Sequence, residues 1–148
     1  KKFDCFFKKI SSNEKNILLI KPLTFMNLSG NAVQKVKTFY NIDKNNVIII
    51  HDDIDLELGR IKLKDGGGDG GHNGLKSIAK MIGSEFIRIR VGVGRPEKID
   101  VSSYVLNNFL ENEVSLLKKI ILKSCEGIKL LIADENEQCK RLFSETIL

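Results

Sequence analysis

The stretch Gly66-Gly67-Gly68-Asp69-Gly70-Gly71-His72-Asn73-Gly74 decides how this chain of 148 residues is organised around it. Glycine loses more backbone freedom on folding than any other residue, so a run this dense is costly to order. The next residues, 75–82, carry apolar side chains at helical spacing rather than continuing as a Ser/Gly linker. A glycine loop that enters a helix presents free backbone N–H groups and the positive end of a dipole. The stretch therefore predicts a ligand-binding loop.

Alternating strands and helices are predicted on both sides of this loop. Strand patterns, including the wet-faced strand that precedes the loop, occupy residues 3–10, 16–20, 47–50, 60–64 and 86–93. Helical spacing occupies residues 32–40, 75–82, 111–132 and 139–147. The continuous β-branched run at 47–50 is typical of a strand buried on both faces. The order predicts an α/β fold: one domain over residues 1–148, with a twisted mixed β-sheet flanked by helices.

The bulk composition narrows the class of protein. Hydrophobic residues at 42% and charged residues at 29% are ordinary for a globular chain. The net charge of +5 fits either a solvated surface or attraction to a polyanion such as nucleic acid. Cys5, Cys125 and Cys139 are odd in number and scattered, which argues against a disulfide framework or a zinc site and for a reducing cytoplasm. No apolar run approaches membrane-spanning length, so no membrane association is expected.

Three polar segments each follow a predicted strand: Thr24–Asn27, His51–Asp55 and the glycine loop with His72 and Asn73. Sites in open α/β sheets gather outside the carboxyl ends of strands, so we expect these segments to form one pocket. Asp52 emerges from the most apolar strand, where a carboxylate can orient an imidazole or simply cap a turn. A metal site is the alternative for this segment. Its candidate ligands are His51, Asp52, Asp53 and Asp55.

The remaining candidates each have a structural and a functional interpretation. Asn27 and Asn73 can donate to a carbonyl oxygen or fix a water, or merely form turns. Phe25 is either a core residue, which the base rate for aromatics favours, or a platform for a base or ribose. His72 is a weak candidate for a general base. A phosphate-binding rim or a solvated face is indicated by Lys62, Lys64, Arg88, Arg90, Arg95 and Lys98.

A dinucleotide-binding loop is a further alternative, because Gly66, Gly68 and Gly71 satisfy G-x-G-x-x-G and Glu85 follows. That fingerprint normally follows a strongly apolar buried strand. The strand predicted before this loop alternates charged and apolar residues instead.

Four spaced blocks, taken together, resemble bacterial peptidyl-tRNA hydrolases. They are Lys21–Gly30 (KPLTFMNLSG), His51–Asp55 (HDDID), Gly66–Lys76 and Arg88–Pro96 (RIRVGVGRP), and Tyr104–Phe109 also fits. The resemblance implies hydrolysis of the ester that joins a peptide to the terminal ribose of tRNA. It also implies a cytoplasmic monomer that needs no cofactor, metal or obligate protein partner, and that binds the CCA end and acceptor stem of peptidyl-tRNA.

The resemblance also implies roles for individual residues. Asp52 would orient and charge a catalytic histidine. Asn27 and Asn73 would serve catalysis, with Asn73 holding the attacking water, and together with Phe25 they would contact the 3′ end. Met26 would shape the peptide cleft. The positions matching phosphate contacts are Lys64, Arg90 and Lys98. These roles displace His72 as the base.

One departure from the family concerns the general base. In the family this histidine lies in an N-terminal segment with a glycine-asparagine-proline-glycine loop, and this sequence contains neither. His51 and His72 each match their own block, so neither is expected to replace it. We expect the natural protein to continue upstream, because removing a central strand would expose two apolar edges. A chain beginning at residue 1 would be inactive, at most an RNA-binding remnant.

Overall fold

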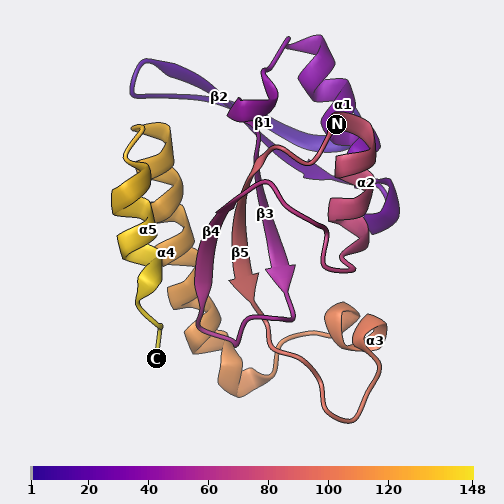
Figure 1. Cartoon of the computed structure of the whole chain (residues 1–148), viewed down its shortest axis with the longest axis vertical. Coiled ribbons are helices and arrows are strands. Elements are labelled where there is room, and N and C mark those ends of the chain that lie inside the picture. Colours follow the sequence, from indigo (N-terminus) through magenta and orange to yellow (C-terminus); the bar gives the residue numbers. More distant parts are fainter. Residues whose placement is uncertain (1) are drawn as a thin grey trace. The chain divides into compact units, whose positions relative to one another are not determined.

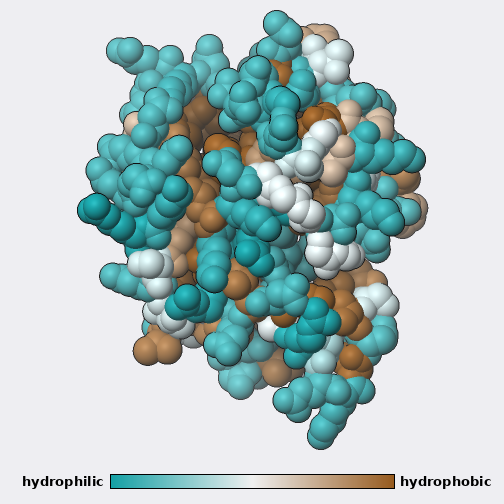
Figure 2. Space-filling model, viewed as in Figure 1, coloured by the Kyte–Doolittle hydropathy of each residue, from teal (hydrophilic) through white to brown (hydrophobic). Residues whose placement is uncertain are grey.

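The computed structural model describes residues 2–148, and the chain divides into two compact units. The first, called here the hairpin unit, comprises the chain up to Ile49 together with Lys64–Ile87. The second, the C-terminal unit, comprises Ile50–Leu63 and Arg88–Leu148. Hydrophilic side chains cover most of the face seen in Figure 2, with apolar residues scattered between them. Among residues 2–148, no helix combines the length and apolar character needed to cross a bilayer.

The hairpin unit begins with two antiparallel strands, β1 (Cys5–Ser12) and β2 (Lys15–Pro22). Asn13 and Glu14 form the two-residue connection, both with positive φ, which matches the twist of a tight hairpin. β2 ends at Pro22, as expected of a residue that cannot donate to a ladder. A 3-10 turn, η1 (Met26–Leu28), then leads into α1 (Ser29–Phe39). A second turn, η2 (Lys44–Asn46), and a second helix, α2 (Asn73–Ile82), complete the elements that lie wholly in this unit.

Three further strands form a mixed sheet in the order β3-β5-β4: β3 (Ile48–Asp53), β4 (Ile61–Asp65) and β5 (Ile87–Gly92) (Figure 1). β3 and β5 run parallel, because Ile87 N donates to Val47 O and, six residues further along both strands, Val93 N donates to Asp53 O. β4 is antiparallel to β5, because Gly66 N donates to Phe86 O while Gly92 N donates to Arg60 O. The predicted α/β class with a mixed sheet is confirmed.

The hairpin unit has a core formed by α1 and α2 with neighbouring strand residues. Val33 and Leu75 pack with Ile78 and Phe86, and Ile20, Val47 and Ile49 lie against them. A second cluster joins Cys5 to Ala32 and Val36 on the hairpin side of α1. The helical spacing read from the sequence therefore identifies the packed faces of both helices.

The C-terminal unit contains α3 (Val101–Leu106), the 3-10 turn η3 (Glu111–Glu113), α4 (Val114–Ile132) and α5 (Asn136–Ser144). α4 and α5 lie side by side (Figure 1). Gly127 allows this close approach, since a Cβ there would overlap the ring of Phe143. All three cysteines are free, and Cys5 and Cys139 are buried. Burial raises the pKa of the Cys139 thiol to about 11.

Two expectations need correction, and one helix was not expected. Ile50 is 52% exposed, so the run at 47–50 is not buried on both faces; β3 lies at an edge of the described sheet. α3 was not expected, because its six residues bury no apolar face; its local signal is Asp100, whose carboxylate accepts from Ser103 N. The last helix ends at Ser144 rather than Ile147, because Ile147 N donates to Gly59 O, 2.9 Å away.

Candidate functional site

Two of the three predicted polar segments meet within the hairpin unit. η1, which contains Met26 and Asn27, packs against α2, which begins at Asn73. The Met26 sulfur lies 2.6 Å from the position that a Cβ on Gly74 would occupy. Any side chain at residue 74 would make the Met26 side chain move, so glycine lets Met26 lie against the start of α2. The expected convergence of these two segments is confirmed.

The side chains at this meeting point are open to solvent. Phe25 is 82% exposed, Met26 is half-exposed, and Asn27 and Asn73 are exposed. The interpretation of Phe25 as a core residue is therefore wrong. The chain leaves β2 at Pro22 and turns outward into η1, while other apolar side chains fill the core beneath. The exposed ring of Phe25 precedes the turn that carries Asn27, and this turn packs against the helix that begins at Asn73. Such a surface can stack on a base and donate hydrogen bonds.

The glycine loop is shaped by its own backbone and by Asp69. Gly70 and Gly71 have φ values of 59° and 83°, a region that L side chains rarely adopt. Asp69 Oδ1 accepts from Gly71 N at 2.8 Å, and the Asp69 carbonyl accepts from His72 N at 3.0 Å. These two hydrogen bonds fix the direction in which the chain enters α2. The loop is therefore an ordered connection to the helix and not a flexible linker, as the apolar residues that follow it indicated.

His72 is the N-cap of α2. Its Nδ1 accepts from Gly74 N at 3.1 Å and from Leu75 N at 3.2 Å. Nδ1 therefore carries no proton in this arrangement, and the imidazole has a structural role. The same two N–H groups are those that a nucleotide phosphate needs at a helix N-terminus. Because His72 already satisfies them, the geometry does not favour the dinucleotide-binding alternative.

The remaining polar segment, His51–Asp55, lies in the C-terminal unit and belongs partly to a strand. β3 extends to Asp53, so His51, Asp52 and Asp53 are its last three residues rather than a loop beyond it. His51 Nδ1 donates to the Asp52 carbonyl oxygen at 2.7 Å, since a carbonyl only accepts. Asp52 itself is half-buried. The hydrogen bond holds the backbone at Asp52, and hence the origin of its side chain.

Asp53 forms an ion pair with Arg90 that the sequence did not lead us to expect. Arg90 Nε donates to Asp53 Oδ2 at 2.7 Å, and the two side chains are 23% and 13% exposed. Burial by itself raises the pKa of the Asp53 carboxyl. The hydrogen bond from Arg90, the backbone N–H of Asp55 and the Arg90 charge outweigh burial, so the pKa lies below its ordinary value. Arg90, predicted as a phosphate contact, is thus oriented by a neighbouring carboxylate.

Loss of this pair has a predictable dependence on pH. A lowered folded-state pKa contributes stability that is present above the unfolded value, about 3.9, and is lost as the pH falls through the folded value. Asp53→Asn should lower the free energy of unfolding by about 2 kcal/mol at pH 7, with the difference from wild type shrinking below pH 4. Urea unfolding at pH 7 and again below pH 4 measures the difference in free energy of unfolding between the variant and wild type. Asp55→Asn, whose exposed pair with Arg95 contributes little, is the control. An equal loss at both pH values would contradict the assignment.

The metal alternative for residues 51–55 has little support from the contacts. Asp53 is paired with Arg90, and Asp55 Oδ1 accepts from Arg95 Nη2 at 2.6 Å. Within the part of the chain that the structure describes, no three His, Cys, Asp or Glu side chains are grouped so that they could hold an ion.

The predicted basic rim divides into exposed and buried members. Lys62, Lys64 and Lys98 are exposed. Arg88 is only 2% exposed, so its inclusion in a phosphate-binding rim is wrong. Arg88 and Arg90 lie two residues apart and thus on one face of β5, which is covered more completely at Arg88.

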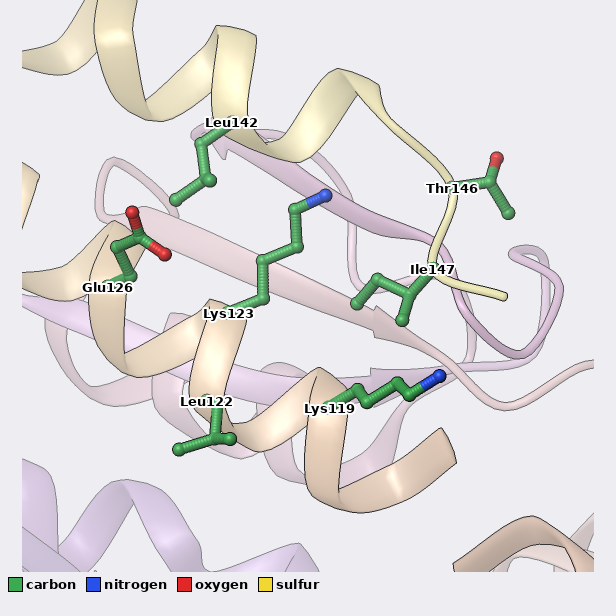
Figure 3. Close-up of a pocket in the computed structure, with 7 residues that line it drawn as sticks. All are labelled: Lys119, Leu122, Lys123, Glu126, Leu142, Thr146 and Ile147. Carbon is green, nitrogen blue, oxygen red and sulfur yellow. The ribbon is translucent and has the colours of Figure 1, made fainter. Parts of the chain in front are cut away.

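A separate hollow of about 430 Å³ lies in the C-terminal unit, between α4, α5 and the segment that follows α5 (Figure 3). Leu122, Leu142 and Ile147 supply its apolar surface. Its two lysines are engaged by the end of the chain: Lys119 Nζ donates to Leu148 O at 2.7 Å and Lys123 Nζ to Glu145 O at 3.1 Å. None of the candidate site residues predicted from the sequence lines this hollow.

The fold places this chain in a class of hydrolases for which structures have been solved. A peptidyl-tRNA hydrolase from Acinetobacter baumannii matches with a TM-score of 0.91 and 36% identity, over 99% of this chain and 75% of that one. The Rickettsia bellii (strain RML369-C) peptidyl-tRNA hydrolase is 49% identical over 141 residues, 95% of this chain and 76% of that protein. The corresponding Rickettsia prowazekii protein is 54% identical over 129 residues, 86% of this chain and 68% of its own length. The profile of the peptidyl-tRNA hydrolase family matches residues 1–147, and the chain belongs to this family.

Proposed function

We infer that this protein hydrolyses the ester bond between peptide and tRNA in peptidyl-tRNA, which frees the tRNA for reuse. Family membership over residues 1–147 is the observation that carries this conclusion. The exposure of Phe25, Asn27 and Asn73 supports it, because a 3′ end with an unstacked base and an ester carbonyl needs a stacking surface and amide donors. No observation favours an RNA-binding remnant.

We propose the following division of roles. Asn73 holds the attacking water, and Asn27 donates to the developing oxyanion or to the 3′ ribose. Asp52 orients a catalytic histidine and stabilises its protonated form as it removes the proton from the water. That histidine is neither His51, whose Nδ1 is bound to the Asp52 carbonyl, nor His72, which caps α2. Met26 shapes the peptide cleft beside Gly74.

The substrate's phosphates would be contacted by two exposed lysines and one partly buried arginine. We propose that Lys64, Arg90 and Lys98 bind the acceptor stem of the tRNA, in agreement with the net charge of +5. The Asp53 carboxylate holds Nε of Arg90 and leaves the guanidinium's remaining N–H groups as donors for a phosphate. A cytoplasmic monomer that acts without a cofactor is part of the same proposal.

Hydrolysis of an N-blocked aminoacyl-tRNA by the natural protein, with and without chelator, tests the proposed function. We expect release of free tRNA and of the N-blocked amino acid at equal rates in both arms. A rate no greater than that of the buffer would overturn the function. Loss of the rate in chelator would overturn the cofactor-free mechanism and leave the reaction itself standing.

Lys64→Ala should raise KM for full-length peptidyl-tRNA several-fold and leave kcat nearly unchanged, because phosphate contacts position a ligand without touching the scissile bond. The slope of log affinity against log salt should become shallower by about one unit. Lys118→Ala, which removes an exposed lysine from α4, is the matched control and should change neither quantity. If a peptide esterified to a short 3′ fragment suffers as much as the full tRNA, Lys64 acts in the catalytic pocket instead.

A further inference from the structure

The first turn of α1 lacks a cap of its own. The residue before the helix is Leu28, which forms no side-chain hydrogen bond to it. The hydroxyl of Ser29, the first helical residue, is turned backward and donates to the Met26 carbonyl at 2.8 Å. The first N–H groups of a helix have no partner within it, so a buried helix start needs acceptors from elsewhere. Ser29 and Gly30 are both buried.

A serine of the neighbouring helix provides one such acceptor. Ser77 Oγ of α2 accepts from Gly30 N at 3.0 Å, across 47 residues of sequence. The two helices approach so closely here that a Cβ on Gly30 would overlap the Ser77 carbonyl oxygen and lie 2.9 Å from Met81 Cγ. Glycine at residue 30 makes this close approach possible. The hydrogen bond to the Ser77 hydroxyl then fixes the distance between α1 and α2 and their position along each other.

The two residues of this contact lie within one turn of the exposed asparagines. Ser77 is four residues after Asn73, one turn along the same face of α2. Gly30 is three residues after Asn27, and the Ser29–Met26 hydrogen bond ties that turn to α1. A shift of α1 along α2 would therefore move Asn27 relative to Asn73.

We propose that Ser77 is a positioning residue for the reaction: its hydrogen bond to Gly30 sets the spacing between Asn27 and Asn73 at the 3′ end of the substrate. This inference rests on the proposed function. The Ser77 hydroxyl acts through the backbone of α1 and does not itself reach the substrate. An amide pair must be held within about 0.5 Å of its productive geometry to act together, so loss of the hydrogen bond weakens recognition of the aminoacyl end.

Two RNA probes test the proposal with the natural protein. Both are short duplex RNAs that end in CCA; one carries an N-acetylaminoacyl group on its 3′ end through an amide, and the other has a bare 3′ end. Calorimetry gives the preference for the acylated probe, which reports contacts at the 3′ end and cancels the phosphate contacts that both probes share. We expect Ser77→Ala to reduce this preference about tenfold, and binding of the bare probe to change little. Ser77→Cys, which keeps the shape but offers a weak acceptor, should give an intermediate preference.

Val36→Ala is the matched control for lost stability. Val36 is a buried residue of α1 that packs with Cys5 and Ala32, so its truncation weakens the fold without touching the Ser77 contact. It should keep the full preference at temperatures where it is folded. If it loses as much as Ser77→Ala, or if Ser77→Ala keeps the preference, the positioning role is wrong while the function stands. Should Ser77→Ala fail to fold, a wild-type preference in Ser77→Cys overturns the proposal. A wild type that binds neither probe overturns the function as well.

Discussion

Asp52→Asn is expected to lower kcat for peptidyl-tRNA by about three orders of magnitude while KM stays within about twofold. The amide keeps the volume of the carboxylate but loses the charge that stabilises an imidazolium in the transition state. The His51 hydrogen bond is made to the backbone carbonyl of residue 52, so it survives the substitution and the strand end keeps its place. Single-turnover kinetics with N-blocked aminoacyl-tRNA, at saturating enzyme, measures the chemical step directly.

Two further measurements separate a catalytic role for Asp52 from a general effect of charge. Asp55→Asn removes one negative charge three residues away, from an exposed pair with Arg95, and should leave kcat within about twofold. The unfolding midpoint of Asp52→Asn in urea should remain near that of wild type. If the asparagine variant turns over at the wild-type rate across neutral pH, the carboxylate does not serve the base, and the assignment of Asp52 to catalysis is lost.

Gly92→Ala is expected to have the largest effect on stability, lowering the free energy of unfolding by about 3 kcal/mol or more. A Cβ on Gly92 would overlap the backbone carbonyl oxygen of Glu57 and lie 2.9 Å from Leu56 Cβ. Gly92 N also donates to Arg60 O at 2.9 Å, so the strand cannot move away without losing a ladder bond. Because the obstacle is backbone, no change of rotamer relieves it. Circular dichroism during urea unfolding gives the free energy.

Gly68→Ala is the matched glycine substitution. No atom lies within 4 Å of the position that its Cβ would occupy, and its φ is outside the left-handed region. We expect it to be neutral or to stabilise slightly, by reducing the freedom of the unfolded chain. A Gly68→Ala protein as unstable as Gly92→Ala would show that the destabilisation arises from something other than overlap with Glu57.

Much of the architecture was predictable from local patterns. Clean alternation in β5 and helical spacing in α2 each concern residues within one element, and their periods of two and 3.6 are set by backbone geometry. The α/β class followed from their order. α3 was not predicted, because six residues without a buried face carry no periodic signal.

Parts of the candidate site were predictable for a different reason. Asp52, Asn73 and Phe25 were proposed as site residues from the residue types in their blocks and from the family resemblance that links these blocks, and their roles stay predictions. Their exposure and their contacts could not be predicted, because these depend on which distant segments pack beside them. The burial of Arg88 and the pairing of Arg90 with Asp53 follow from the neighbours of β5 rather than from its own sequence.

The hydrogen bond from Gly30 to Ser77 also bears on how the hairpin unit folds. α1 has 11 residues and no local cap, so as an isolated helix it is marginal in water. Its first turn acquires an acceptor only after the chain has closed a loop of 47 residues and formed α2. Formation of α1 and docking of α2 are therefore coupled. The amide hydrogen of Gly30 should exchange with solvent only when the two helices separate, and so report the cooperativity of the whole unit.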